Sequence, residues 1–129
     1  MGLQICFDVR FAEGALALRA RGAQLLTYPS AFTVPTGRAH WRTLLRARAV
    51  ETQSFVVAAA QCGAHNARRV SYGHGLVVGP WGDVLVELGG VEEWTGEPLL
   101  GVAEIDLEVL RKVRSEMPLV RRTDVYPEL

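Results

Sequence analysis

The chain has 129 residues, 49% of them hydrophobic, and its 14 basic and 14 acidic residues give a formal net charge of zero. This length fits one globular domain, and the apolar content argues against a disordered chain. Because the charge is balanced, the arginines are scattered and no apolar run approaches the roughly 20 residues of a membrane span, we expect no nucleic-acid partner and no membrane partner.

The first part of the chain predicts alternating strands and helices, which is the pattern of an α/β fold. We expect residues 3–7 to form a first strand and residues 14–21 a short helix that ends at Gly22. A second strand is expected at residues 24–28. A long loop is then expected at residues 30–39, and connections of this length often carry binding residues.

The middle of the chain contains the clearest helix, at residues 40–53, because its tryptophan and leucines are spaced for one apolar face. Residues 55–60 are continuously apolar, which predicts a strand that is buried on both faces. We expect residues 61–72 to form a polar loop. Residues 75–78 and 83–87 then predict two strands of a hairpin.

The last part of the chain predicts an acidic loop at residues 89–98 and a further strand at residues 99–105. A helix is expected at residues 106–117, with Asp106 as its N-cap. A charged, extended tail is expected at residues 119–129. No repeat or linker divides the chain, so we expect one domain or one piece of a domain.

Two cysteines, Cys6 and Cys62, are too few for a disulfide framework. No charged and apolar leader opens the chain, so we expect no secretory signal. Free thiols favour a reducing compartment. The expected location is therefore cytoplasmic, with a mitochondrial location as the alternative for a full-length form.

Cys6 is the strongest candidate for a reactive group. It ends a short apolar run and is followed directly by an aromatic residue, an acid and, two residues later, an arginine. Strand ends that lead into turns are where α/β folds place catalytic groups. A thiol becomes a nucleophile when its thiolate is stabilised or when a base takes its proton. A small, buried structural cysteine is the alternative interpretation.

Short motifs along nearly the whole chain resemble those of the nitrilase superfamily of carbon–nitrogen hydrolases, and most of all its Nit-type amidases that act on deaminated glutathione. The matching segments are residues 2–13, 26–32, 37–51, 58–63, 71–75, 80–82 and 121–126. Two residues beside the cysteine depart from the family pattern. Phe7 stands where a tyrosine is usual, and Ala12 stands where a proline is usual.

The resemblance implies an α/β fold of a particular kind, the C-terminal half of a four-layer α-β-β-α sandwich, with residues 1–129 as one partial carbon–nitrogen hydrolase domain. It also implies a homodimer formed through the C-terminal region. The implied substrate is a small amide such as deaminated glutathione. No cofactor is implied. His65 and His74 lack the spacing of zinc ligands, so we expect no metal.

The family chemistry places Cys6 as the nucleophile that forms a thioester, with the backbone N–H of Phe7 stabilising the oxyanion. In the family the glutamate base and the lysine precede the cysteine. The one lysine of this chain, Lys112, is expected on a solvated helix face. We therefore expect a fragment that is weakly active or inactive alone. The expected substrate-binding residues follow the second strand and are Ser30, Ala31, Phe32, Thr33 and His40.

Two other functions stay open at this point. The first is a non-catalytic dimerisation partner or a truncated isoform of the full-length amidase. A redox protein that uses both cysteines is the weaker alternative, because no Cys-x-x-Cys motif is present. The charged side chains near Cys6 are expected to form a structural ion-pair network rather than to bind substrate. Its members would be Asp8, Arg10, Arg46, Arg48 and Glu51.

Overall fold

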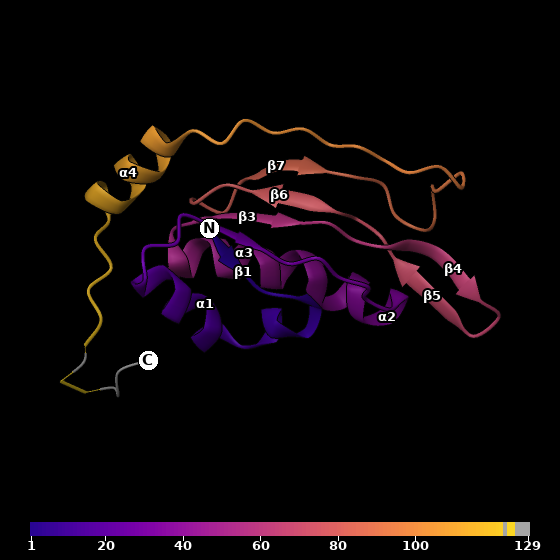
Figure 1. Ribbon diagram of the computed structural model, residues 1–129, viewed down its shortest axis with the longest axis horizontal. Helices are drawn as coiled ribbons and strands as arrows, with labels where there is room; N and C mark the ends of the chain where they lie inside the picture. The colour runs from indigo at the N-terminus through magenta and orange to yellow at the C-terminus, as the bar shows by residue number, and fades with distance from the viewer. Residues whose placement is uncertain (123, 126–129) are drawn as a thin grey trace.

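A computed structural model describes residues 1–122, 124 and 125 of the protein. It contains a five-stranded sheet in the order β1-β2-β3-β6-β7 and a separate hairpin of β4 and β5 (Figure 1). The strands are β1 (Gly2–Leu3), β2 (Leu25–Thr27), β3 (Phe55–Ala58), β4 (Cys62–Asn66), β5 (Arg69–Tyr72), β6 (Leu76–Val78) and β7 (Val84–Glu87). The helices are a 3₁₀ turn (Cys6–Arg10), α1 (Ala12–Ala20), α2 (Val34–Thr36), a π-helical segment (Gly37–Trp41), α3 (Arg42–Thr52) and α4 (Leu107–Glu116).

The large sheet is parallel in its first half and antiparallel in its second. β1 pairs in parallel with β2 and β2 with β3, while β3, β6 and β7 pair antiparallel. Three parallel strands place their carboxyl ends at one edge of the sheet. That edge is where α/β sheets bind ligands.

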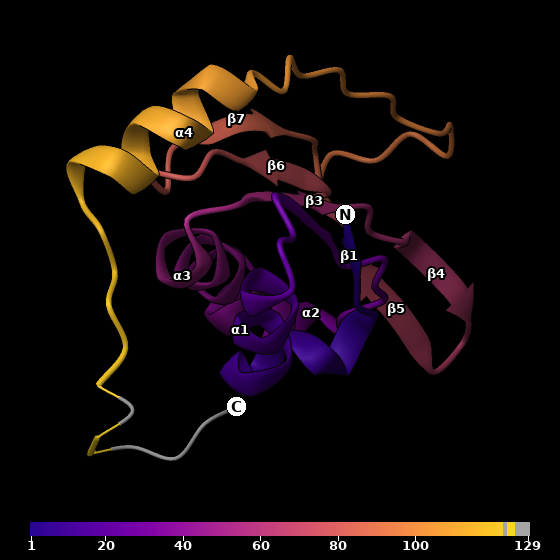
Figure 2. The ribbon, with the colours of Figure 1, turned by 60° about the vertical axis from the view of Figure 1, so that its left-hand side comes forward.

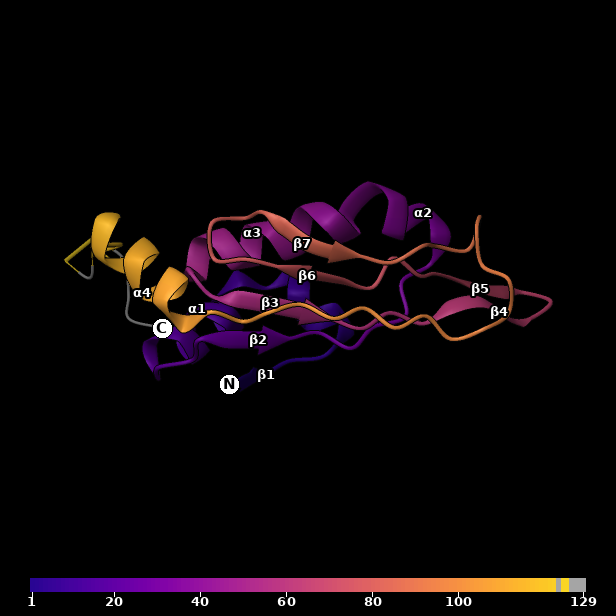
Figure 3. The same cartoon turned by 90° about the horizontal axis from the view of Figure 1, so that it is seen from above.

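The helices α1 and α3 cover one face of the sheet, as Figure 2 shows. The strand side chains that point toward them are fully buried, including Leu26, Val56 and Val78. The opposite face is more open, and Leu3 is 70% exposed. Seen from above, an extended segment runs across the sheet toward α4 (Figure 3). The chain therefore forms a helix layer and a sheet layer, and among the described residues the extended segment and α4 lie over the second side of the sheet.

Several sequence-based expectations are wrong in detail. The chain leaves the sheet after Leu3 rather than continuing as a strand through residue 7. The Asp8 carboxylate accepts a hydrogen bond from the Ile5 N–H at 2.8 Å, and this bond closes the 3₁₀ turn. Residues 61–72 form the exposed hairpin of β4 and β5 instead of a loop. Residues 99–105 are extended but form no strand.

Other expectations are confirmed within a few residues. The helices predicted at residues 14–21, 40–53 and 106–117 correspond to α1, α3 and α4, and Asp106 caps α4 by accepting the Glu108 N–H at 2.8 Å. The long loop at residues 30–39 contains α2 and the start of the π-helical segment. The tail expected at residues 119–129 includes positions 123 and 126–129, which lie outside the described residues.

Candidate active site

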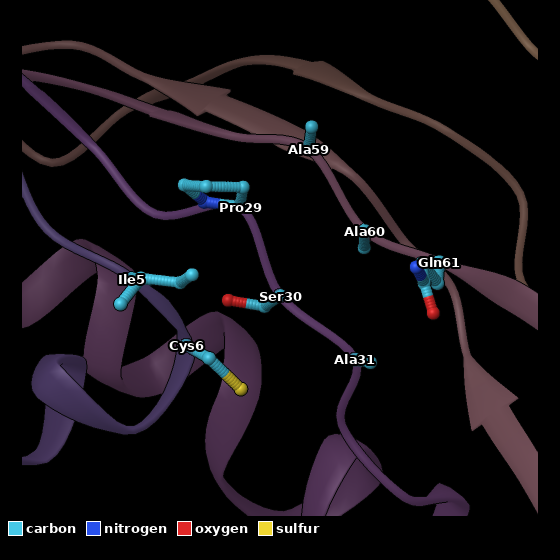
Figure 4. Close-up of a pocket in the computed structure, with 8 residues that line it drawn as sticks. All are labelled: Ile5, Cys6, Pro29, Ser30, Ala31, Ala59, Ala60 and Gln61. Carbon is cyan, nitrogen blue, oxygen red and sulfur yellow. The ribbon is translucent and has the colours of Figure 1, made fainter.

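A pocket of about 440 Å³ lies at the edge of the sheet where the three parallel strands end. Its walls come from the segments that follow β1, β2 and β3. The lining residues, drawn in Figure 4, are Ile5, Cys6, Pro29, Ser30, Ala31, Ala59, Ala60 and Gln61. The site predicted from the sequence at Cys6 is therefore a hollow built from three separate parts of the chain.

Cys6 lies where the chain leaves β1 and enters the 3₁₀ turn. Its N–H donates to the Pro29 carbonyl at 3.0 Å, and the Gln4 N–H donates to the Thr27 carbonyl at 3.1 Å, so the segment stays fixed along β2. The backbone of Cys6 has a φ of 44°, in the left-handed region. This conformation costs a non-glycine residue roughly 1–2 kcal/mol, and residues held in it often belong to functional sites.

The Cys6 thiol is half-buried, and Figure 4 shows its side chain pointing toward the segment that carries Ser30 and Ala31. The N–H of Phe7 lies in the first turn of the 3₁₀ segment, and no protein acceptor takes its hydrogen bond among the described residues. An unpaired N–H beside a thiol is the arrangement that can receive a developing oxyanion.

The wall opposite Cys6 is held by backbone hydrogen bonds. The Ser30 N–H donates to the Ala59 carbonyl at 2.9 Å, and the Gln61 N–H donates to the Ser30 carbonyl at 2.9 Å. The buried Ser30 hydroxyl donates to the Tyr28 carbonyl at 3.0 Å. Ser30 and Ala31 therefore form a rigid wall of the pocket. The N–H, carbonyl and hydroxyl of Ser30 are already hydrogen-bonded within the protein.

Phe32, Thr33 and His40 do not line this pocket. Phe32 is buried and packs on Trp41, with ring centroids 4.8 Å apart. The Thr33 hydroxyl, directly before α2, lies 2.8 Å from the hydroxyl of Thr36, the last residue of α2. His40 is exposed, and its Nδ1 accepts from the Arg10 guanidinium at 3.3 Å. These three residues could therefore influence substrate binding only indirectly, through the residues that line the pocket.

Gln61 lines the pocket but was not expected to bind substrate. Its backbone is fixed on both sides, because its carbonyl also accepts from the Gly73 N–H at 3.1 Å. Its position directly after a buried strand could have predicted its place in the pocket, because parallel strands bring the residues that follow them together at one edge of the sheet.

The pocket carries little charge. No carboxylate and no lysine lines it within the part of the chain that the structure describes. Lys112 is exposed on α4, with its Nζ 3.9 Å from Glu116 Oε1. The ion-pair network expected near Cys6 is confirmed only in part among the described residues, because Arg48 pairs with Glu51. Asp8 and Arg46 bind backbone groups instead, and Arg10 contacts His40 and two aromatic rings.

Cys62 has different surroundings. It lines a separate hollow of about 240 Å³ with His74 and Trp94, and burial raises the pKa of its thiol. Both cysteines are free thiols. Among the described residues, no group of three or more His, Cys, Asp or Glu side chains is placed to hold a metal ion. Within residues 1–122, 124 and 125, every helix is too short or too polar to cross a bilayer.

Comparison with known proteins gives a consistent result. Residues 1–115 match the family model described as carbon-nitrogen hydrolase. The human deaminated glutathione amidase is 53% identical over 131 residues, covering 100% of this chain and 38% of that protein. Overall, the chain spans less than half the length of the curated relatives it matches.

Solved structures agree in fold. The crystal structure of the Caenorhabditis elegans NitFhit protein matches with a TM-score of 0.86 and 53% identity, covering 97% of this chain and 29% of that chain. A mutant amidase from Nesterenkonia sp. AN1 carries the acetamide moiety of fluoroacetamide covalently added at its active site cysteine. It matches with a TM-score of 0.60 and 42% identity, covering 67% of this chain and 32% of that chain.

Proposed function

The chain belongs to the carbon–nitrogen hydrolase family, and on that premise we propose that it carries the nucleophile of a thiol amidase. The proposed substrate is a small amide, and deaminated glutathione is the first candidate because the human relative is named for it. The observation that carries the proposal is Cys6 in a left-handed conformation at the pocket, beside a Phe7 N–H that no acceptor of the described residues pairs with.

The proposed reaction begins when the Cys6 sulfur attacks the amide carbon and the carbonyl electron pair moves to oxygen, which gives a tetrahedral intermediate. The carbonyl then reforms, the C–N bond breaks, and the nitrogen leaves as ammonia with the proton that the thiol has lost. The acyl group remains on the sulfur as a thioester, and water hydrolyses it to the carboxylic acid and the free thiol. The Phe7 N–H donates to the oxyanion of each tetrahedral intermediate. A donor of this kind typically lowers the barrier by roughly 3–4 kcal/mol.

Substrate contacts are proposed along the wall opposite the thiol. Ser30 and Ala31 would contact the acyl group directly, because they line the pocket. Phe32, Thr33 and His40 stay predictions, supported by their position on the same segment and on the helix that follows it. No cofactor or metal takes part in the proposed chemistry.

The described pocket lacks the acid and the lysine that would complete the site. General-base assistance is typically worth about 10²–10⁴ in rate. We therefore propose that these 129 residues alone are weakly active or inactive, and that activity belongs to a protein that supplies both groups. A non-catalytic dimerisation partner is the second candidate, favoured by the same lack of acid and lysine in the pocket.

We also propose that the chain forms a homodimer through its C-terminal region and that it is cytoplasmic. The exposed apolar residues of the extended segment before α4, such as Leu100 and Val102, support the first statement. The two free thiols support the second, because reducing compartments preserve thiols.

The test is ammonia release from deaminated glutathione and from 2-oxoglutaramate. The purified chain is assayed beside the human amidase, together with Cys6→Ala and the matched control Cys62→Ala. We expect little turnover by the chain, and we expect whatever turnover exists to disappear in Cys6→Ala only. Turnover equal to that of the relative would refute the incomplete site, and turnover that survives Cys6→Ala would refute the nucleophile.

A further inference from the structure

Arg10 lies next to the proposed site and contacts two aromatic rings. It ends the 3₁₀ turn that begins at Cys6, and its guanidinium carbon lies 5.2 Å from the ring centroid of Phe7 and 5.3 Å from that of Phe32. Its terminal nitrogen lies 3.3 Å from His40 Nδ1. The ion pairs of the described residues do not include Arg10.

Through these contacts Arg10 connects an exposed aromatic residue, Phe7, to a buried one, Phe32. Phe7 is 62% exposed, and its other aromatic neighbour is the exposed Phe11, with ring centroids 6.0 Å apart. Phe32, in contrast, is 7% exposed and is packed against the buried Trp41. A guanidinium attracts the faces of both rings. Arg10 therefore links the 3₁₀ turn that carries Phe7 to the buried Phe32.

The position of Phe7 matters because its N–H is the proposed oxyanion donor. The peptide that carries this N–H joins Phe7 to Cys6, whose φ of 44° must be held by its surroundings. The ring can rotate about its Cα–Cβ bond without turning this N–H, but a shift of the whole 3₁₀ turn displaces the N–H relative to the thiol. Small displacements of such a donor reduce the stabilisation of a transition state.

We propose that Arg10 is a positioning residue that holds the Phe7 N–H in line with the Cys6 thiol. The inference rests on the proposed function, because it assigns a role to Arg10 only if the Phe7 N–H receives an oxyanion. Arg10 lines neither of the two hollows and acts through Phe7 rather than on the substrate.

The experiment compares two electrophiles on the same thiol. When a thiolate adds to acrylamide, the S–C bond forms at the β-carbon and negative charge develops on the carbonyl oxygen, which is then protonated. When a thiolate displaces iodide from iodoacetamide, the negative charge leaves with the iodide. An oxyanion donor therefore accelerates only the first reaction, and the ratio of the two rate constants measures the donor.

Both rates are measured by mass spectrometry at Cys6 and at Cys62 in the same 129-residue chain, so that Cys62 is the internal reference. In the unmodified chain we expect the ratio of acrylamide rate to iodoacetamide rate to be higher at Cys6. In Arg10→Gln we expect that ratio to fall roughly threefold to tenfold at Cys6 only. Arg42→Gln is the matched control, because this exposed arginine pairs with Glu87 and lines neither hollow.

A second variant separates positioning from general loss of structure. Phe7→Leu keeps the N–H but removes the ring that Arg10 contacts, and circular dichroism reports whether each variant is folded. We expect Phe7→Leu to lower the ratio as Arg10→Gln does, and the double variant to lower it little further. If Arg10→Gln does not fold, Phe7→Leu alone decides, because its ring is exposed.

Different results would overturn the oxyanion role of the Phe7 N–H and the positioning role of Arg10. Equal ratios at Cys6 and Cys62 in the unmodified chain would overturn the oxyanion role of Phe7 and the role of Arg10 with it. A higher ratio at Cys6 that is unchanged in Arg10→Gln and Phe7→Leu would overturn the role of Arg10 alone.

Discussion

At the scale of single residues, Cys6 has a strained backbone and a side chain that lines the pocket. Its φ of 44° is one of three positive values at non-glycine residues in the described structure, and only this one belongs to the pocket. The hydrogen bond from Cys6 to Pro29 holds the conformation. Strain of this kind is kept where the direction of a side chain matters more than stability.

The strain at Cys6 predicts an order of stability among variants. Cys6→Gly should be more stable than Cys6→Ala by about 1 kcal/mol, because glycine adopts the left-handed region without a Cβ clash. Urea unfolding monitored by circular dichroism measures the difference. Equal stability of the two variants, or greater stability of the alanine variant, would show that the backbone at Cys6 is not strained.

Tyr28 predicts a dependence of stability on alkaline pH. It is fully buried, its hydroxyl donates to the Gln4 side chain, and burial raises its pKa to about 12. Because the folded pKa lies above the unfolded value near 10, the contribution of Tyr28 is complete below pH 10 and is lost as the pH rises toward 12.

The measurement is the free energy of unfolding of the unmodified chain and of Tyr28→Phe across this pH range. The difference between them should change by roughly 2–3 kcal/mol in favour of the phenylalanine variant as the pH rises from 9 to 12. Arg114 titrates in the same range, because burial lowers its pKa to about 10, but its effect is common to both chains and cancels. A constant difference would contradict the prediction.

At the scale of elements, the attachment of α3 to the 3₁₀ turn depends on one buried arginine. Arg48 is 5% exposed, donates from Nε to the Val9 carbonyl at 2.9 Å and pairs with Glu51. Arg46, two residues earlier on the same helix, also donates to a carbonyl, that of Gly82, but its side chain is exposed. The pair allows a matched comparison.

We expect Arg48→Met to lower the free energy of unfolding by about 2–4 kcal/mol, because it leaves the buried Val9 carbonyl unpaired and removes the partner of Glu51. Arg46→Met should cost less than about 1 kcal/mol, because water can replace its hydrogen bond. Thermal or urea unfolding of both variants checks this. Similar losses in the two variants would contradict the role given to Arg48.

The elements also show what the sequence could predict. The helix α3 was predictable because its apolar residues recur with helical spacing. The strand expected at residues 3–7 was not separable from a turn, because a short apolar run fits both until the Asp8 side chain bonds to the Ile5 N–H. The hairpin of β4 and β5 is polar on its exposed faces and therefore resembles a loop in sequence.

The site was predictable in part for the same reasons. Cys6 stood out by its neighbours, and Ser30 and Ala31 by their place after the second strand. Gln61 and Arg10 were not assigned to the site, because their positions depend on contacts between segments far apart in the chain. Such contacts have no local pattern in the sequence.

At the scale of the whole molecule, one face of the sheet carries α1 and α3, and the extended segment and α4 lie on the other side (Figure 2). Apolar side chains are exposed on that side and on the segment before α4, including Leu3 at 70%, Val102 at 81% and Leu100 at 88%. Surfaces of this kind mark interfaces, and open strand edges template association.

We therefore expect the purified chain to self-associate. Size-exclusion chromatography with light scattering should give a mass above the 14.1 kDa of one chain. The double variant Leu100→Lys, Val102→Lys should shift the mass toward that of the monomer, whereas Thr95→Lys, at another exposed position, should not. A monodisperse monomer with a cooperative thermal transition would refute this expectation.

The central claim is that Cys6 is the nucleophile of an acyl-transfer site, and direct acylation tests it. The chain is treated with p-nitrophenyl acetate, which transfers its acetyl group without help to the leaving group, and peptides are examined by mass spectrometry. We predict that Cys6 gains an acetyl group released by hydroxylamine, as a thioester is, and that it does so faster than Cys62, whose thiol pKa is raised by burial. Acetylation of Cys62 at an equal or higher rate, or no thioester at Cys6, would contradict the claim.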